Sequence, residues 1–289
     1  CRGYHRCHRA FPDPDPGCQT PRDGSVRSLK RNIISTAVIT TVALPFTILI
    51  IWSFSNRWFY PELWPRQWGL RAWDYVFGTA GYQIIGALVQ SMLVALATAL
   101  ISVAIGIPAG RALGLYDFRG KDLISVILTL PVIVPPLCVA MGLHFWFIKM
   151  GLASTFSGVV LVHLTFCLPY SVFVLWGVFS NYNPDYEAQA RSLGATSWKV
   201  VARVMLPLTF PGIMVAALFS FLLSWSQYLS TLIIGGGKIT TLPVLLFALM
   251  GSGDRPVAAA VSIVFVVPAF VALLFSARYL GGKSIAGIR

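Results

Sequence analysis

Charged residues are scarce in this chain, and acidic residues are the scarcest. Only 11% of its 289 residues are charged, and just ten are Asp or Glu. A soluble domain carries about 25% charged residues. Apolar residues make up 56% of the chain, and the mean hydropathy is +0.74. The five scattered cysteines do not form a disulfide framework. This composition predicts an integral membrane protein of the all-α class.

Signatures of catalysis and nucleotide binding are also missing. The chain has no phosphate loop, no HExxH zinc site, no Gly-x-Ser-x-Gly elbow and no pair of intramembrane aspartates. We therefore predict no catalytic residue, no metal site and no cofactor bound by this chain. The N-terminal segment does contain five possible soft-metal ligands, without the paired spacing of structural zinc sites: Cys1, His5, Cys7, His8 and Cys18. We expect residues 1–31 to form a disordered cytoplasmic tail, because they are rich in proline and lack a periodic apolar face.

Six apolar runs are long enough to cross a bilayer, which takes about 20 residues. The predicted spans, within a transmembrane domain at 32–280, are 33–54, 84–109, 123–148, 156–179, 208–234 and 257–277. A cytoplasmic tail is expected at 281–289. None of the ten acids lies inside a predicted span, as expected where a central charge costs about 2.5 to 3.5 kcal/mol. Buried helices of a large soluble protein are the alternative, but they seldom run this far without polar interruption.

The net charge of +12 follows the predicted membrane topology. With a cytoplasmic N-terminus, 16 of the 22 Lys and Arg residues fall in cytoplasmic tails and connections. This asymmetry agrees with the positive-inside rule and places both termini in the cytoplasm. A nucleic-acid-binding patch explains the charge less well, because the basic residues do not cluster with aromatic side chains on a soluble module. We therefore predict a membrane partner and no nucleic acid.

Two segments between the spans are predicted to lie at the outer membrane surface. Residues 55–83 are rich in Trp, Tyr and Phe, which prefer the headgroup layer, so we expect interfacial anchoring and, as the alternative, docking of an outer partner. Residues 239–250 are apolar but too short to span, so we expect a re-entrant or interfacial segment.

Three prolines interrupt the third predicted span: Pro131, Pro135 and Pro136. Each removes a backbone donor and bends a helix, and the freed carbonyls then need partners from a neighbouring helix or a water-lined cavity. The pattern predicts a kink that serves as a gate or, equally, contributes to ordinary helix packing.

Polar residues recur along the fifth predicted span at the spacing of one helix face. The stripe consists of Ser220, Ser224, Gln227 and Thr231. It lines a solute path, with Trp225 and Tyr228 on adjoining faces, or it holds the bundle together by hydrogen bonds. We favour the path, because Gln227 is larger than the Ser and Thr residues typical of close helix contacts. His144 and His163, in other spans, are expected to be hydrogen-bonded structural residues.

A polar segment between the fourth and fifth spans carries helix-capping signals. Asn183-Pro184 predicts an N-cap followed by Pro at the first helical position. Gly194 is expected to end this helix in a left-handed conformation, and Ser197 to cap a second helix. We therefore predict two short cytoplasmic helices at 183–204.

This hairpin is predicted to dock on another protein, because a simple connection needs neither caps nor an apolar face. Small apolar side chains would form the contact, and Glu187 and Arg191 would set its charge register. The candidate docking residues are Glu187, Ala188, Ala190, Arg191, Leu193, Gly194 and Ala195.

The same segment resembles a known family motif. Glu187-Ala188, Gly194 and Leu206-Pro207 are similar in spacing and position to the EAA motif of permease subunits of binding-protein-dependent ABC importers, with Gln189 where that family usually has Ala. The resemblance covers about residues 33–280. Ser192-Leu-Gly-Ala195 and Pro207-x3-Pro211-Gly212 are more similar to the polyamine, thiamine and ferric-iron branch. Thr241-Leu-Pro243 also occurs in sugar permeases, so a sugar-type permease is the alternative.

The resemblance implies a bundle of about six transmembrane helices with a cytoplasmic coupling hairpin, in a bacterial inner membrane. It implies four partners: a second permease subunit in a heterodimer, two ATPase subunits that bind ATP and Mg²⁺, an external solute-binding protein and membrane lipid. The solute would be a polyamine or another small organic molecule.

Functions from other classes fit the residues less well. An ion-coupled secondary transporter normally carries ionisable relay residues inside the membrane, and the predicted spans hold no acids. A membrane-embedded enzyme would need a catalytic constellation, and a channel subunit has no need of a capped docking hairpin. A requirement for ATP during uptake separates the importer from all three.

Overall fold

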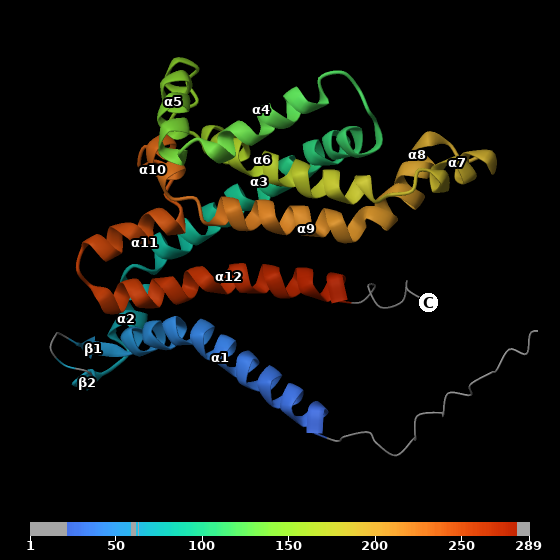
Figure 1. The fold of residues 1–289 in the computed structure, drawn as a ribbon. Helices are drawn as coiled ribbons and strands as arrows, with labels where there is room; N and C mark the ends of the chain where they lie inside the picture. The colour runs from blue at the N-terminus through green and yellow to red at the C-terminus, as the bar shows by residue number, and fades with distance from the viewer. Residues whose placement is uncertain (1–21, 59–61, 63, 282–289) are drawn as a thin grey trace, which may run out of the picture. The chain divides into compact units, whose positions relative to one another are not determined.

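The computed structural model describes residues 22–58, 62 and 64–281, and most of these are helical (Figure 1). Residue contacts divide the chain into two compact units, 1–48 and 49–289. The first unit contains most of α1 (Arg22–Ser53). Residues 22–31 therefore extend the first helix, and our expectation of a disordered tail is wrong for them. The rest of that predicted tail and residues 282–289 lie outside the described residues.

A small aromatic subdomain opens the second unit. It comprises a two-stranded antiparallel sheet of β1 (Ser55–Arg57) and β2 (Gln67–Trp68), then α2 (Arg71–Asp74) and a π-helical turn, η1 (Tyr75–Thr79). Trp73 stacks on Phe77 and lies tilted by 38° against Phe54, with ring centroids 5.9 Å from each. Arg71 makes a bidentate ion pair with Asp254, which precedes α12. The aromatic segment is thus folded against the start of α12 (Arg255–Gly281).

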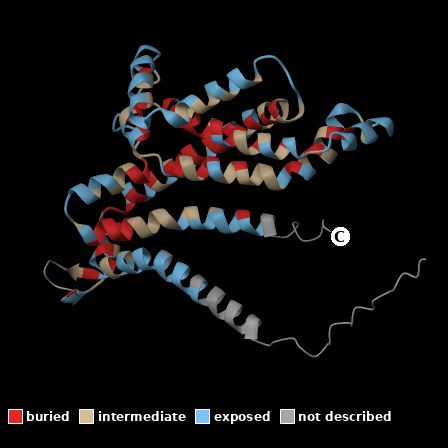
Figure 2. Cartoon of the chain, viewed as in Figure 1, coloured by how far each residue is buried: buried red, intermediate tan, exposed pale blue. Residues whose placement is uncertain are grey.

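Three long helices form the centre of the second unit: α3 (Gly81–Leu115), α6 (Phe156–Ser180) and α9 (Leu206–Trp225). Buried residues concentrate along them in Figure 2. At one end of the bundle α3 and α6 approach very closely, because Gly110 and Gly114 face α6. A Cβ added at either glycine would lie 2.7 Å from the Cβ of Leu175 or Phe179. The packing of small residues lets the two backbones meet, as in other membrane helix pairs.

The third predicted span is not one helix. It consists of α4 (Lys121–Ile133) and α5 (Pro136–Lys149), which meet at an angle of 102°. Val134 is extended, with ψ 135°, as residues before proline prefer, and Pro136 starts α5 at its first turn. The predicted kink is therefore present, and it is sharp enough to make this segment a broken span or a re-entrant loop.

The fifth predicted span also differs from expectation, at both ends. Its helix continues directly from the hairpin, since residues Ser197–Trp225 form one apolar stretch long enough to span. It then ends at Trp225, and a separate short helix, α10 (Leu229–Gly235), follows. Gly236, with φ +53°, ends α10 in the left-handed conformation that favours glycine. The polar residues of the predicted stripe keep helical spacing across residues 226–228, so the sequence pattern did not indicate this break.

Two further apolar helices of the second unit pack against the central three. The described residues include five helices long and apolar enough to cross a membrane, or six when α4 and α5 count as one span. α11 (Leu242–Gly251) is shorter and packs against α3 and α12. Its ten residues cannot span, which agrees with the re-entrant or interfacial segment predicted at 239–250.

Candidate functional site

The predicted hairpin is present as α7 (Asp185–Ser192), α8 (Ser197–Val200) and a π-helical turn, η2 (Val201–Met205), that leads into α9. The helix begins at Asp185 with Pro184 at the N-cap position, one residue later than predicted, but Asn183 Oδ1 still accepts a hydrogen bond of 2.8 Å from the backbone N–H of Asp185. Thr196, and not Ser197, occupies the N-cap position of α8, and it makes no side-chain cap bond.

Gly194 ends α7 as predicted. Its φ is +83°, in the left-handed region that favours glycine. The N–H of Gly194 bonds to the carbonyl of Arg191 at 2.9 Å, and the N–H of Ala195 bonds to that of Ala190 at 3.0 Å. This pair of bonds is a Schellman motif, which satisfies carbonyls that the helix end leaves free. The bend between the two helices is thus fixed by backbone geometry.

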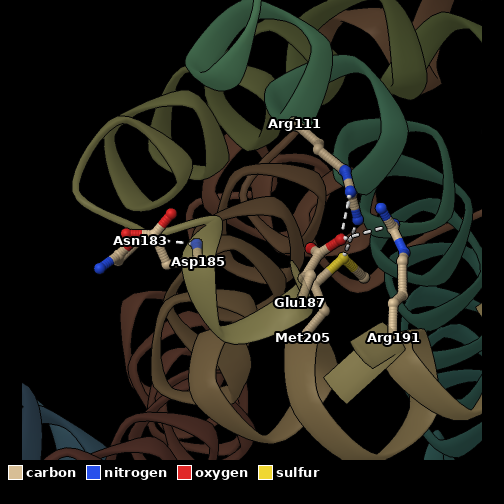
Figure 3. A network of polar contacts seen from close by, with 6 residues as sticks. All are labelled: Arg111, Asn183, Asp185, Glu187, Arg191 and Met205. Carbon is tan, nitrogen blue, oxygen red and sulfur yellow. Dashed lines mark hydrogen bonds and ion pairs between the residues drawn. The ribbon is translucent and has the colours of Figure 1, made fainter. Parts of the chain in front are cut away.

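Glu187 does not face outward, contrary to the expectation that it sets the charge of a docking surface. Its side chain is only 4% exposed and points into the bundle, where its Oε2 accepts a hydrogen bond of 2.8 Å from Arg111 of α3 (Figure 3). Arg191 reaches the same oxygen at 3.2 Å from the next turn of α7. The second guanidinium nitrogen of Arg111 lies 2.8 Å from Met205 Sδ in η2. One Arg111 side chain therefore holds both arms of the hairpin.

A tyrosine hydroxyl completes this buried cluster. Burial and the negative charge of Glu187 raise the pKa of Tyr182, which follows α6. Among the described residues, neither Glu187 Oε1 nor the Tyr182 hydroxyl has a hydrogen-bond partner within standard distance. The cluster therefore places a tyrosine hydroxyl beside the buried carboxylate that Arg111 holds.

The outward face of the hairpin is apolar at its tip. Leu193 is 89% exposed and Trp198 is 75% exposed, although large apolar side chains normally avoid water. Ala188 is also exposed, whereas Ala190 and Ala195 are half-buried. A shallow hollow on α7 is lined by Asp185, Ala188, Gln189, Ser192 and Leu193. Sequence reasoning missed Trp198, although an isolated Trp in a polar segment was the signal that pointed to it.

The polar stripe of α9 and α10 is largely occupied within the subunit. His163 of α6 hydrogen-bonds through Nδ1 to Ser224 Oγ, at 2.8 Å, and through Nε2 to Thr231 Oγ1, at 2.9 Å. Ser220 is buried beside Cys167 of α6. These contacts match the alternative in which the stripe holds helices together, and they confirm the structural role expected for His163. The same expectation is not met by His144, whose Nδ1 has no partner in the described chain.

Of the six predicted path residues, two remain partly accessible and four are buried. Trp225 is buried, stacks on Phe265 of α12 at 5.5 Å, and donates to its carbonyl. Gln227 and Tyr228 are half-exposed at the break between α9 and α10, where Tyr228 stacks on Phe247 at 4.0 Å. The prolines at 131, 135 and 136 lie at the α4–α5 bend. The helices that follow the break and the bend, α10 and α5, pack against each other, so these two features are close in the fold.

Comparison with known proteins identifies the family. The family model described as the binding-protein-dependent transport system inner membrane component matches residues 102–283. The chain belongs to this family. This permease is 25% identical over 251 residues to the spermidine/putrescine transport system permease protein PotC of Haemophilus influenzae, covering 86% of this chain and 96% of PotC. It is 30% identical over 209 residues to the trehalose transport system permease protein SugB of Mycobacterium tuberculosis, covering 70% and 76%.

Solved structures agree with the fold of this permease. A bacterial ABC transporter involved in the import of the acidic polysaccharide alginate matches with a TM-score of 0.68 and 14% identity, covering 90% of this chain and 98% of that chain. The alginate transporter in complex with its alginate pentasaccharide-bound periplasmic protein matches with a TM-score of 0.60 and 16% identity, covering 86% and 94%. The family and all-α membrane fold implied by the EAA motif are confirmed, so the chain is a permease subunit of a binding-protein-dependent ABC importer.

Proposed function

We propose that the α7–α8 hairpin is the coupling element of this permease and docks on a cytoplasmic ATPase. The observation that carries the proposal is its two-sided construction: Leu193 and Trp198 are exposed on one side, and Glu187 is anchored to Arg111 on the other. Apolar anchors at the tip of a rigid element are typical of protein docking sites. A rigid attachment to the bundle would carry the partner's movement into the membrane helices.

The proposed assembly contains a second permease, which we expect to be a different chain, and two ATPase subunits that bind ATP and Mg²⁺. An external binding protein would deliver the solute, as the family description and the complex formed by the alginate transporter suggest. ATP hydrolysis belongs to the partner subunits, and both termini and the hairpin face the cytoplasm. Gln227 and Tyr228, at the break after α9, are the candidate path residues with side chains left accessible.

We propose a polyamine as the solute, because the PotC relatives match this permease over nearly their whole length. A sugar is the second candidate, supported by the 30% identity to SugB. Gln227 and Tyr228 offer an amide, a hydroxyl and an aromatic face, which suit either solute.

The test is uptake by proteoliposomes that contain the complex purified with its ATPase and binding protein. We expect uptake of labelled spermidine or putrescine that requires ATP inside the vesicle. Trehalose uptake in place of polyamine uptake would support the second candidate. Uptake driven by a proton or sodium gradient without ATP would contradict the importer mechanism.

A further inference from the structure

Arg111 is the one charged residue of α3, and its position requires a reason. It lies on the last turns of α3, four residues before the helix ends at Leu115. Its side chain is 22% exposed and faces the hairpin, not water. A planar guanidinium can hold two acceptors at once, which a lysine ammonium on a flexible stem does less rigidly. Here it holds Glu187 of α7 and Met205 of η2, each at 2.8 Å (Figure 3).

The attachment point cannot slide along its neighbour. Gly110 precedes Arg111 in the chain, and its missing side chain lets α3 rest on the backbone of α6 at Leu175. One turn further, Gly114 makes the same contact with Phe179. These close contacts lock α3 and α6 into one packed pair, because any axial shift would drive side chains into backbone. A force applied at Arg111 therefore reaches both helices together.

The hairpin is connected to the bundle in three ways. Two connections are covalent, because residues 181–184 join α7 to α6 and because α8 and η2 continue into α9. The third is the ion pair from Glu187 to Arg111. No other ion pair among the described residues joins the hairpin to a different helix. Without it, the hairpin would lose its ion pair to α3 and would be linked to the α3–α6 pair through the covalent connection and apolar packing.

We propose that Arg111 is a positioning residue for energy coupling: through Glu187 it joins the docking hairpin to the α3–α6 pair. This inference rests on the proposed docking of the hairpin on an ATPase. It separates two tasks within one motif. Leu193 and Trp198 hold the partner, whereas Arg111 and Glu187 transmit the partner's movement. Glu187, buried in the permease, acts through Arg111.

The test separates assembly from coupling. The complex with its ATPase and binding protein is purified with wild-type permease, Arg111→Gln or Arg111→Lys. For Arg111→Gln we expect normal co-purification and basal ATP hydrolysis, but at least about a tenfold loss of the stimulation given by the solute-loaded binding protein, within the usual size of a coupling effect. Uptake should fall in parallel. For Arg111→Lys, the stimulation and the uptake should lie between those of the wild type and those of Arg111→Gln. Lysine keeps the charge but cannot bridge both arms of the hairpin as rigidly.

The matched control is Lys121→Gln. Lys121 forms an ion pair of 2.9 Å with Asp117, which lies in the connection between α3 and α4. Lys121 is close in sequence to Arg111, but its hydrogen bonds among the described residues go to Tyr116 and Asp117 and not to the hairpin. This variant should keep full stimulation. The double variant with reversed charges, Arg111→Glu with Glu187→Arg, should recover part of the stimulation that either single reversal loses.

Three outcomes would overturn the inference. Unchanged stimulation in Arg111→Gln would mean that Glu187 acts without α3. Loss of the ATPase from the purified Arg111→Gln and Arg111→Lys complexes would mean that Arg111 only shapes the docking surface. If the wild-type permease itself retains no ATPase, the proposed function fails, and this inference fails with it. Thermal unfolding of each variant in detergent shows that the compared permeases are folded.

Discussion

Gly194 shows how much of the hairpin depends on a single backbone conformation. Its φ of +83° costs about 1 to 2 kcal/mol for a residue with a Cβ, although a Cβ there would meet no atom within 4 Å. The cost is therefore strain and not collision. Gly194→Val should distort the bend and reduce the amount of ATPase that co-purifies with the permease. Gly194→Asn, whose side chain tolerates the left-handed region, should retain most of it; equal behaviour of the two variants would contradict this explanation.

Asp254 gives a pH-dependent prediction at the other end of the bundle. Hydrogen bonds from Arg71 lower the pKa of Asp254 below its ordinary value, so the folded state favours the ionised carboxylate. The stabilisation is present above the unfolded pKa of about 3.9 and is lost as the pH falls through the lower folded value. Because both side chains are partly exposed, Asp254→Asn should cost at most about 1 kcal/mol. Unfolding in detergent should show this difference at pH 7 and a smaller one at pH 3.

Local signals in the sequence were enough to predict the hairpin but not its anchor. Asn183, Pro184 and Gly194 act on backbone groups within a few residues, so their roles can be read from spacing alone. Arg111 meets Glu187 across 76 positions of sequence. Such a pairing depends on how three helices pack, and no periodic pattern encodes it. A lone Arg near the end of a long apolar run was the one available hint.

Among the helices, α3 and α6 should tolerate substitutions very differently at their glycines. Gly110→Ala would place a Cβ 2.7 Å from that of Leu175 and 2.9 Å from backbone, so we expect a loss of about 1 to 3 kcal/mol from overpacking. Gly177 of α6 has no atom within 4 Å of the same added Cβ. Gly177→Ala should be neutral or stabilising by up to about 1 kcal/mol. Thermal unfolding of both variants in detergent checks the contrast, and similar melting temperatures would contradict the packing explanation.

His163 should stabilise the fold by hydrogen-bonding to both sides of the break between α9 and α10. His163→Leu would leave the buried hydroxyl of Ser224 without this partner, at a cost of about 1 to 3 kcal/mol, whereas Thr231 keeps its bond to the carbonyl of Gln227. The double variant that adds Ser224→Ala should recover part of the stability, because it also removes the unsatisfied hydroxyl. Unfolding measurements on both variants test this. No recovery would mean that shape, and not hydrogen bonding, decides the effect.

The positions of helices were easier to predict than their breaks. Long apolar runs located most of the spans, because a bilayer demands length and low polarity. The break after Trp225 was missed, since Ser220, Ser224 and Thr231 keep helical spacing across it. The hydrogen bonds that hold both sides of the break come from His163 on another helix. Tertiary partners, and not local propensity, decide where such a helix ends.

For the molecule as a whole, the proposed orientation gives a simple labelling experiment. In a variant without native cysteines, Leu193→Cys in the hairpin should react with a membrane-impermeant maleimide only in inverted vesicles. Ser252→Cys, exposed between α11 and α12, should react in intact cells. The reason is the excess of Lys and Arg in the connections expected on the cytoplasmic side. The reverse pattern would contradict the proposed placement of both the hairpin and the termini.

The hairpin continues into α9 without a loop, so no flexible connection separates the two. Residues Ser197–Trp225 form one stretch of 29 residues, roughly 40 Å long at 1.5 Å per residue. If a helix of this length tilts by about 5° about the hairpin end, its other end moves by roughly 3.5 Å. The far end is Trp225, where the helix breaks before Gln227 and Tyr228. A small tilt of the hairpin would therefore displace the end of α9 next to those two side chains by about the diameter of an atom.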